Sequence, residues 1–292
     1  MTKEFKTIDE QINLLKSRGL IIENESLAKE FLLKNNYYRI SGYTLTLREK
    51  DVFYKGITLE NVIDIYEFDK NLRNILLYKL EIIEVQIKSI YAYEFAQHFS
   101  PLDYLNENIF TNSEKYREIM KKTNEQKAIR LKHEAYLQHY ENELHEELPI
   151  WVYVDLLTFS DISNLYEISE EKFKTAVAVH YNLNYTKSSK IIAGYLHHLS
   201  NIRNLCAHGS RLYNRLFIRK PNLNKKELSL LRKDKKGFPD NTHLYGFFFI
   251  LKRLLSEEEF NQVKESIITL QKKYRFVDMR YYGFGANWYN DL

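Results

Sequence analysis

The segment from Arg203 to His208 holds three side chains suited to cutting a phosphodiester bond. Arg203 offers a planar set of donors that fits a phosphate. Histidine side chains change protonation near neutral pH, so His208 could accept or give a proton. Asn204 lies four residues before His208, so on a helix it could hold the imidazole by a hydrogen bond. The three predict ribonucleolytic chemistry, with Arg203, His208 and Asn204 as candidate catalytic residues.

In this chemistry, His208 removes the proton of a ribose 2′-hydroxyl, and the oxygen attacks the adjacent phosphorus. Arg203 stabilises the developing negative charge. The products are a 2′,3′-cyclic phosphate and a free 5′-hydroxyl, and no metal is required. One helix supplies a single histidine, so a two-fold homodimer would provide one as base and one as acid. Arginine and histidine are also ordinary residues at helix ends, so the spacing alone leaves a capping role open.

A helix from about 188 to 208 must position these groups. An apolar stripe with spacings of three and four residues predicts its buried side, and Arg203, Asn204 and His208 fall outside that stripe. Gly209 is well placed as a left-handed C-terminal stop. The stripe consists of Ile192, Tyr195, Leu199, Ile202 and Cys206.

The basic charge of the chain is concentrated directly after this helix. From Arg211 to Lys236 there are ten Lys or Arg and two acids, although the whole chain has a net charge of only +4. Such a surplus attracts polyanions, although it could also be a solubilising loop. Tyr38 and Arg39 could stack and grip bases, or their segment could pack as an ordinary hairpin. The candidate RNA-binding residues are Arg211, Asn214, Arg215, Arg219, Lys220, Lys225, Lys226, Tyr38 and Arg39.

Four blocks of sequence resemble, in order, those of the Abi-like family of abortive-infection proteins of the AbiD/AbiF type. The block RNLCAHGSRLYNR (203–215) also resembles the R-x4-6-H signature of HEPN-superfamily ribonucleases. Gly209 and Tyr213 depart from the His and Trp that the family often has there, but neither is part of the Arg203–His208 pair. The resemblance covers about residues 30 to 255, and its other blocks are NNYYRISGY (35–43), IYEFDKNLRNILLYKLEIIE (65–84) and LPIWVYVDLLTFSDISNLY (148–166).

This resemblance implies a dimeric helical HEPN fold, RNA as substrate or ligand, and a role in bacterial defence against phage. It also implies an inhibitor or antitoxin, such as a small structured RNA, that restrains a toxic nuclease. The leading hypothesis is therefore a metal-independent endoribonuclease acting as a homodimer in abortive infection. The alternative is a non-catalytic RNA-binding regulatory module of the same fold. A helical scaffold with a protein ligand is the third possibility.

The expected fold is all-α, a mostly helical bundle with one small β-hairpin. We expect two short helices in residues 5–34, a hairpin between Gly42 and Gly56, and a helix of about forty residues from Thr58 to Phe99, which a break near Tyr78 could divide. Three parts follow: residues 1–57 with the hairpin, a core over 58–215, and 216–292 packing on it. Further helices are expected in 113–147, after Pro149, and over 170–180, 242–255 and 256–274, with Trp151 in the core and the aromatic tail folded back.

Composition excludes several classes of protein. The 292 residues include 9 Gly, 4 Pro and one cysteine, Cys206. So few breakers argue against a many-turned β-sandwich, and a single cysteine excludes an internal disulfide framework. No long apolar stretch or signal peptide is present, so we expect a cytoplasmic protein with no membrane partner. Without HExxH, GxGxxG or P-loop motifs, we expect no metal and no cofactor.

Overall fold

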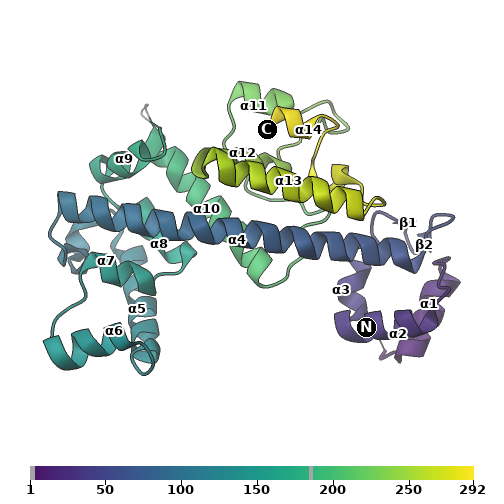
Figure 1. Cartoon of the computed structure of the whole chain (residues 1–292), viewed down its shortest axis with the longest axis horizontal. Coiled ribbons are helices and arrows are strands. Elements are labelled where there is room, and N and C mark those ends of the chain that lie inside the picture. The colour runs from purple at the N-terminus through teal and green to yellow at the C-terminus, as the bar shows by residue number, and fades with distance from the viewer. Residues whose placement is uncertain (1–3, 184–186) are drawn as a thin grey trace.

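The structure, a computed structural model, describes residues 4–183 and 187–292. Its α-helices are organised around one long helix, α4 (Leu59–His98), which runs through the molecule (Figure 1). The other α-helices are α1 (Ile8–Ser17), α2 (Glu25–Asn35), α3 (Tyr37–Ser41), α5 (Ser113–Arg130), α6 (Ala135–Gln138), α7 (Ile150–Tyr153), α8 (Phe159–Ile168), α9 (Glu171–Val179), α10 (Ser188–Ala207), α11 (Lys225–Leu230), α12 (Tyr245–Leu254), α13 (Glu257–Lys273) and α14 (Trp288–Asp291).

Short helical turns and a two-stranded hairpin complete these elements. The turns are η1 (Asp103–Leu105), η2 (Glu107–Ile109), the π-helical η3 (His139–Leu144), η4 (Val154–Leu156) and η5 (Met279–Tyr282). The strands β1 (Arg48–Glu49) and β2 (Val52–Phe53) pair antiparallel, with Arg48 opposite Phe53. The all-α fold with one small hairpin is therefore confirmed.

Local sequence accounts for the length of α4. Thr58 caps its start, since the Thr58 side chain accepts a hydrogen bond from the Asn61 N–H at 3.3 Å and the Asn61 side chain accepts one from the Thr58 N–H at 3.0 Å. No Gly or Pro interrupts the 40 residues, which span about 60 Å. The helix continues through Tyr78 without a break, so α4 is a single rod on which other helices pack.

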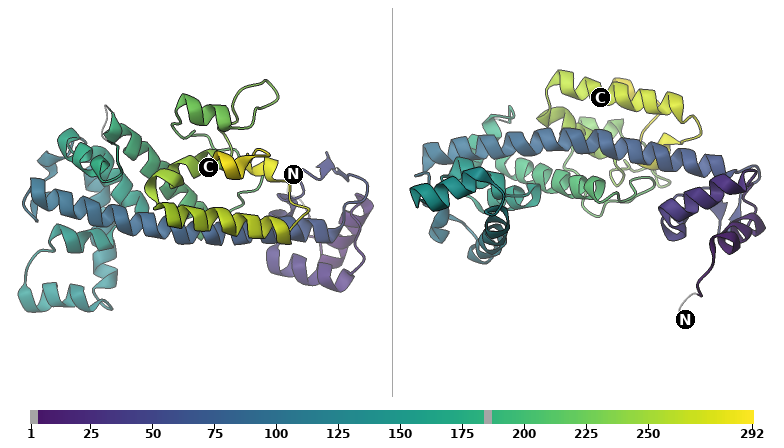
Figure 2. Two further views of the ribbon diagram at one scale, coloured as in Figure 1. Left: turned by 45° about the horizontal axis from the view of Figure 1, so that its top comes forward. Right: turned by 60° about the horizontal axis from the view of Figure 1, so that its bottom comes forward.

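Two helices from distant parts of the sequence pack along α4. Helix α10 lies against one side of α4 and α13 against another (Figure 2). Ser256 caps α13 with a reciprocal pair of bonds to Glu259, which fixes where that helix begins. The predicted helices over 188–208 and 256–274 are thus confirmed, and α4 fixes their positions in space.

The N-terminal region differs from its prediction in one respect. The alternation of Tyr43, Leu45 and Leu47 suggested a strand, but these residues form turns, and the strands begin only at Arg48. Tyr43 is fully buried and Leu47 is nearly so. Tyr43 and Leu47 therefore pack on the core from irregular turns, whereas Leu45 is 50% exposed, and the hairpin is shorter than expected.

The opposite end of α4 carries α5 to α9. Helices α5 and α6 lie within the segment 113–147, where helices are predicted, and they project away from α4 (Figure 1). Trp151 in α7 was expected in the core, but it is 55% exposed. Its neighbours Ile150 and Tyr153 take the buried side of this single-turn helix, so the Trp151 ring faces outward.

The C-terminal tail folds back onto the body, as predicted. Tyr282 and Phe284 are buried, and Trp288 is almost fully buried. The Tyr282 hydroxyl donates a hydrogen bond to Asp69 of α4 at 2.9 Å. Among the described residues, none of the helices has both the length and the apolar character needed to cross a membrane.

Candidate active site

The candidate residues lie at the C-terminal end of α10. The stripe that includes Ile192 and Leu199 is buried, as its spacing predicted. Gly209 adopts φ +63°, and two bonds close the helix: the Gly209 N–H donates to the Cys206 carbonyl at 3.0 Å and the Ser210 N–H to the Leu205 carbonyl at 2.8 Å. This is the Schellman arrangement in which glycine is favoured. It ends the helix sharply and turns the chain back.

Arg203 points from α10 toward α4 and pairs there with Glu84. Its Nε and Nη2 donate to one carboxylate oxygen of Glu84 at 3.2 and 2.9 Å. Lys88, one turn further along α4, contacts the other oxygen of Glu84 at 3.1 Å. The Arg203 side chain keeps 27% of its surface exposed. The guanidinium is thus held in place while still reachable from solvent.

Asn204 contacts Arg203 instead of the His208 ring. Its side-chain oxygen accepts a bond from Arg203 Nη1 at 3.1 Å, and its amide donates to the Ser160 hydroxyl at 3.2 Å. We expected Asn204 to hold the imidazole, but only the His208 backbone N–H bonds to Asn204, through the Asn204 carbonyl at 3.0 Å. Asn204 therefore orients the guanidinium and ties it to the start of α8.

His208 is the C-cap residue of α10 and is exposed. Within the described part of the chain its ring makes no hydrogen bond. Five residues rotate a helix by about 140°, so Arg203 faces α4 while His208 projects from the helix end. A solvent-exposed imidazole and a fixed guanidinium thus lie at the same end of α10, about 140° apart around the helix axis.

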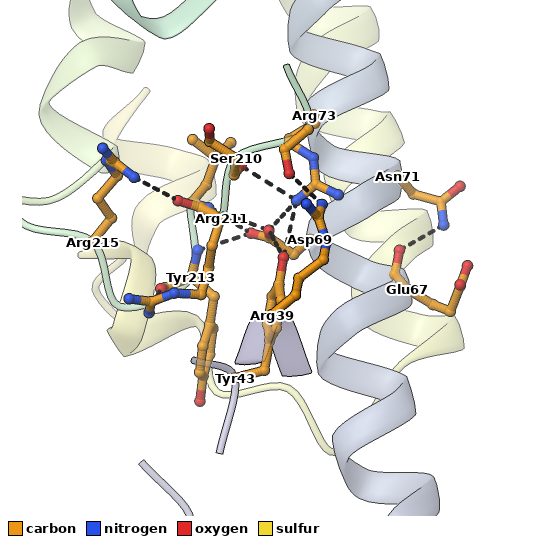
Figure 3. Close-up of polar contacts among 12 residues, drawn as sticks. Arg39, Tyr43, Glu67, Asp69, Asn71, Arg73, Ser210, Arg211, Tyr213 and Arg215 are labelled. Carbon is orange, nitrogen blue, oxygen red and sulfur yellow. Dashed lines mark hydrogen bonds and ion pairs between the residues drawn. The ribbon is translucent and has the colours of Figure 1, made fainter. Parts of the chain in front are cut away.

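The loop after α10 is fixed by a buried carboxylate, Asp69 of α4 (Figure 3). The backbone N–H of Tyr213 donates to Asp69 at 2.8 Å and that of Leu212 at 3.2 Å. The hydroxyl of Tyr43 donates at 2.8 Å, and Arg73, one turn along α4, forms an ion pair with the same carboxylate. The hydroxyl of Tyr282 also donates to it. Asp69 therefore has donors from four segments of the chain: the turn at Tyr43, α4 itself, the loop after α10 and the C-terminal tail.

Burial dominates the electrostatics of this cluster. It raises the pKa of Asp69, an effect that the charge of Arg73 and the surrounding donors oppose. It also raises the pKa of Tyr43, and the Asp69 charge adds to that shift. The Tyr43 hydroxyl therefore remains a protonated donor. The cluster anchors the loop that begins one residue after Gly209, and so it fixes the direction in which the chain leaves the His208 end of α10.

Two predicted RNA-binding arginines are engaged within the protein beside this loop. Arg39 of α3 donates to the carbonyl of Gly209 and lies 5.8 Å from the ring centre of Tyr66. Arg211 donates to the carbonyl of Tyr213. The structure thus brings Arg39 and Arg211 to the motif, where they hold the turn that follows α10.

Asn214 and Arg215 continue the same loop. Asn214 adopts φ +50°, and its N–H donates to the Tyr281 carbonyl of the tail at 2.9 Å. Arg215 donates to the Arg211 carbonyl at 3.3 Å (Figure 3). Burial, with the charge of Arg211, lowers the pKa of Arg215. Asn214 thus joins the loop to the tail, whereas the Arg215 side chain lines a hollow beside α10.

The remaining candidates lie further from His208. Arg219 and Lys220 line a hollow beside α10, and Lys225 and Lys226 are exposed in the first turn of α11. Tyr38 is 87% exposed in α3, next to Arg39. The predicted set is therefore divided among the motif loop, the α10 groove and two separate surfaces.

Sequence reasoning did not assign Glu84 or Asp69 to the site. The sequence favours a plain i,i+4 pair of Glu84 with Lys88, a contact that the structure contains. Its alternative is that an acidic residue of this helix orients Arg203 or His208, and Glu84 does contact Arg203. Asp69 occupies an apolar seam position, since Ile65, Asp69, Leu72 and Leu76 follow spacings of four, three and four. A carboxylate in such a seam is buried and must find donors, and this was the available signal for the cluster.

Comparison with known proteins gives one match. A family model described as Abi-like protein matches residues 30–214. The matched region includes α3 to α10, with Asp69, Glu84, Arg203 and His208, and ends in the loop anchored by Asp69. No curated protein and no solved structure matches the chain.

Proposed function

Because the chain belongs to the Abi-like protein family, we propose that it is an endoribonuclease of the HEPN type that cuts RNA in abortive infection. The family itself indicates a role in abortive infection, a defence against phage. The observation that supports nuclease chemistry is the pairing at the end of α10: Arg203 is fixed by Glu84 and Asn204, and His208 is open to solvent. A fixed cation and an exposed imidazole at the same helix end suit attack on a phosphodiester that reaches both groups.

In the proposed reaction, His208 takes the proton of a ribose 2′-hydroxyl as the oxygen attacks the adjacent phosphorus. The bond from phosphorus to the 5′-oxygen breaks, which leaves a 2′,3′-cyclic phosphate, and the departing oxygen receives a proton. Arg203 stabilises the negative charge that builds on the phosphoryl oxygens. The second proton requires a second acid, because one His208 cannot be both protonated and deprotonated at once.

A second copy of the chain can supply that acid. An exposed apolar patch, formed by Val85, Tyr93 and Trp151, borders a groove of about 560 Å³ that Lys88 also lines. These three side chains are 62%, 60% and 55% exposed. Large exposed apolar patches mark interaction sites. Lys88 forms an ion pair with Glu84, the residue that holds Arg203. In a homodimer formed through this patch, the interface would therefore lie next to the candidate site.

The test is cleavage of labelled RNA in EDTA by the purified full-length protein. Wild type should release fragments with 2′,3′-cyclic phosphate ends. His208→Ala and Arg203→Ala should each lower the rate by about 10² to 10⁴-fold, and His133→Ala, on an exposed histidine of the α5–α6 turn, should leave it unchanged. Equal cleavage by wild type and both site variants would refute the assignment.

A non-catalytic RNA-binding module is the second candidate. It is favoured by one observation, the ion pair that already neutralises Arg203 through Glu84. This function predicts RNA binding without cleavage, and binding that persists in His208→Ala. The same cleavage experiment, with binding measured in parallel, distinguishes the two functions. A small RNA or protein inhibitor that restrains the nuclease, and location in the cytoplasm, are further parts of the proposal.

A further inference from the structure

A groove runs along α10 away from the His208 end. One hollow of about 330 Å³ lies between α10 and the returning segment 215–219. A second, of about 610 Å³, continues to Lys190 at the start of α10 and to Lys174 of α9. The two share His197, His198 and Arg219. The two hollows thus adjoin along α10. We refer to them together as the α10 groove, and the loop after α10 contributes one of its walls.

Three cations of the groove have no carboxylate of the described chain within ion-pair distance. Arg219 donates a hydrogen bond to Nε2 of His197 at 2.7 Å. Because this nitrogen accepts the bond, the His197 ring is neutral. Burial, with the charge of Arg219, lowers the pKa of His197. Among the described residues, Lys190 and Lys220 form no ion pair. Arg219, Lys190 and Lys220 thus have no carboxylate of residues 4–183 and 187–292 in direct contact, and a cluster of cations of this kind attracts a polyanion.

The acids of the groove are already paired. Glu167 contacts Lys115 at 2.7 Å, and Lys174, also in the groove, contacts Glu171 at 3.3 Å. The charge of Glu167 is thus offset by a lysine outside the groove. With Arg215, Arg219, Lys190 and Lys220, the lining of the groove holds more basic than acidic side chains.

The returning segment also exposes apolar side chains beside these cations. Ile218 is 99% exposed and Leu216 is 66% exposed. Phe217 between them is buried, and its N–H donates to the Thr242 carbonyl at 2.7 Å, which holds the segment extended. Unpaired bases offer apolar faces to such side chains, whereas a duplex hides its bases in the stack. The combination fits a single strand.

The groove and His208 share one face of α10. Asn201 and His208 follow His197 by 4 and 11 residues, and 11 residues turn a helix by about 20° beyond three full turns. The rise from His197 to His208 is about 17 Å. A strand whose scissile phosphate lies at His208 can therefore continue along α10 onto Arg219.

We propose that this groove, lined by Lys190, His197, Arg215, Arg219 and Lys220, binds the phosphodiester backbone of single-stranded RNA and leads it to His208. The inference rests on the proposed nuclease function for its direction, but binding is testable without cleavage. The strand lies along α10, its phosphates contact Arg219 and the lysines, and its bases cover Leu216 and Ile218.

Binding is measured by fluorescence anisotropy of a labelled 12-nucleotide single strand, with all variants made on a His208→Ala background. Arg219→Glu and Lys190→Glu should each weaken binding about 10-fold and lower the salt slope by about 0.7 for each phosphate that the variant no longer neutralises. Lys272→Glu, the same charge change on α13, should bind as the parent does. A 12-base-pair RNA duplex should bind more weakly than the single strand.

Equal affinity of the groove variants and the parent would overturn the proposal, as would a duplex that binds as tightly as the single strand. The cleavage arm separates this failure from failure of the nuclease. With His208 restored, Arg219→Glu should cut long RNA more slowly than wild type, whereas Lys272→Glu on α13 should cut it at the wild-type rate. If wild type binds the single strand tightly in the groove but cuts no RNA, the groove proposal stands and the proposed nuclease function is refuted.

Discussion

Arg203 and Glu84 form a two-bond ion pair across 119 positions of sequence, between the end of α10 and the middle of α4. The bonds fix the plane of the guanidinium. They also join the candidate catalytic helix to the rod on which the fold is organised. Lys88 completes the arrangement by contacting the other carboxylate oxygen. In the proposed reaction, Glu84 is therefore a positioning residue that acts through Arg203.

Replacing Glu84 should impair cleavage without abolishing RNA binding. Glu84→Ala frees the guanidinium, and a displacement of about 1 Å at a reacting group can cost about 10²-fold in rate. Glu84→Gln keeps one oxygen that can accept from Arg203, so it should recover part of that rate. The effect should fall on kcat more than on KM, as measured by steady-state cleavage of labelled RNA. Identical kcat values for Glu84→Ala and wild type would exclude the positioning role.

Asp69→Asn should destabilise the protein by about 3–5 kcal/mol, because it leaves Arg73 buried and unpaired. The Arg73 side chain is only 5% exposed in this pair and Asp69 is fully buried. Urea unfolding followed by circular dichroism measures the change. Asp51→Asn is the matched control, since its pairs with Arg18 and Arg48 lie at the surface and contribute little. A midpoint for Asp69→Asn equal to that of the control would contradict the anchoring role.

Gly209→Ala should lower stability by about 1–2 kcal/mol. Its φ of +63° is in the left-handed region, and an added Cβ would lie 3.2 Å from Nη2 of Arg39. Gly194→Ala is the control within the same helix, where no atom lies within 4 Å and φ is ordinary. It should stabilise α10 by about 0.5–1 kcal/mol. In thermal unfolding, the midpoint temperature should therefore fall for Gly209→Ala and rise for Gly194→Ala.

Acid should destabilise the fold through His198. Burial is the main cause that lowers its pKa to about 4, below the unfolded value of about 6.5. The neutral ring therefore contributes stability that is fully present above pH 6.5 and is lost as the pH falls toward 4. We therefore compare the free energy of unfolding at pH 7 and pH 5. After allowance for partial solvent exposure, this free energy should fall by about 1 kcal/mol less in His198→Phe than in wild type. Urea unfolding at the two pH values measures this, and parallel losses would reject the assignment.

Trp151→Asp should convert the proposed dimer into a monomer, because it places a charge in the exposed patch with Val85 and Tyr93. Sedimentation velocity at micromolar concentration measures the change. Leu33→Asp on α2, also a large exposed apolar side chain at 76%, is the control and should remain dimeric. Cleavage by Trp151→Asp should fall in parallel. A wild type that sediments as a monomer would reject the dimer directly.

The sequence alone determined the elements, because their causes are local. The spacing of apolar residues predicted α4 and α10, Thr58 and Ser256 capped helices where expected, and Gly209 ended α10. The same local pattern placed Arg203 and His208 at one helix end. Trp151 and the Tyr43–Leu47 turns show the limit, because in a single-turn helix or an irregular turn periodicity does not decide which side is buried.

Only the tertiary structure decided which partners these residues have. Glu84 and Lys88 are four residues apart and could be paired from the sequence, but the contact of Glu84 with Arg203 depends on how α10 crosses α4. Asp69 gathers donors from four segments, and the α10 groove exists because the chain turns back at Gly209. Such contacts depend on packing between surfaces that are far apart in the chain, and no periodicity within a single helix contains that information.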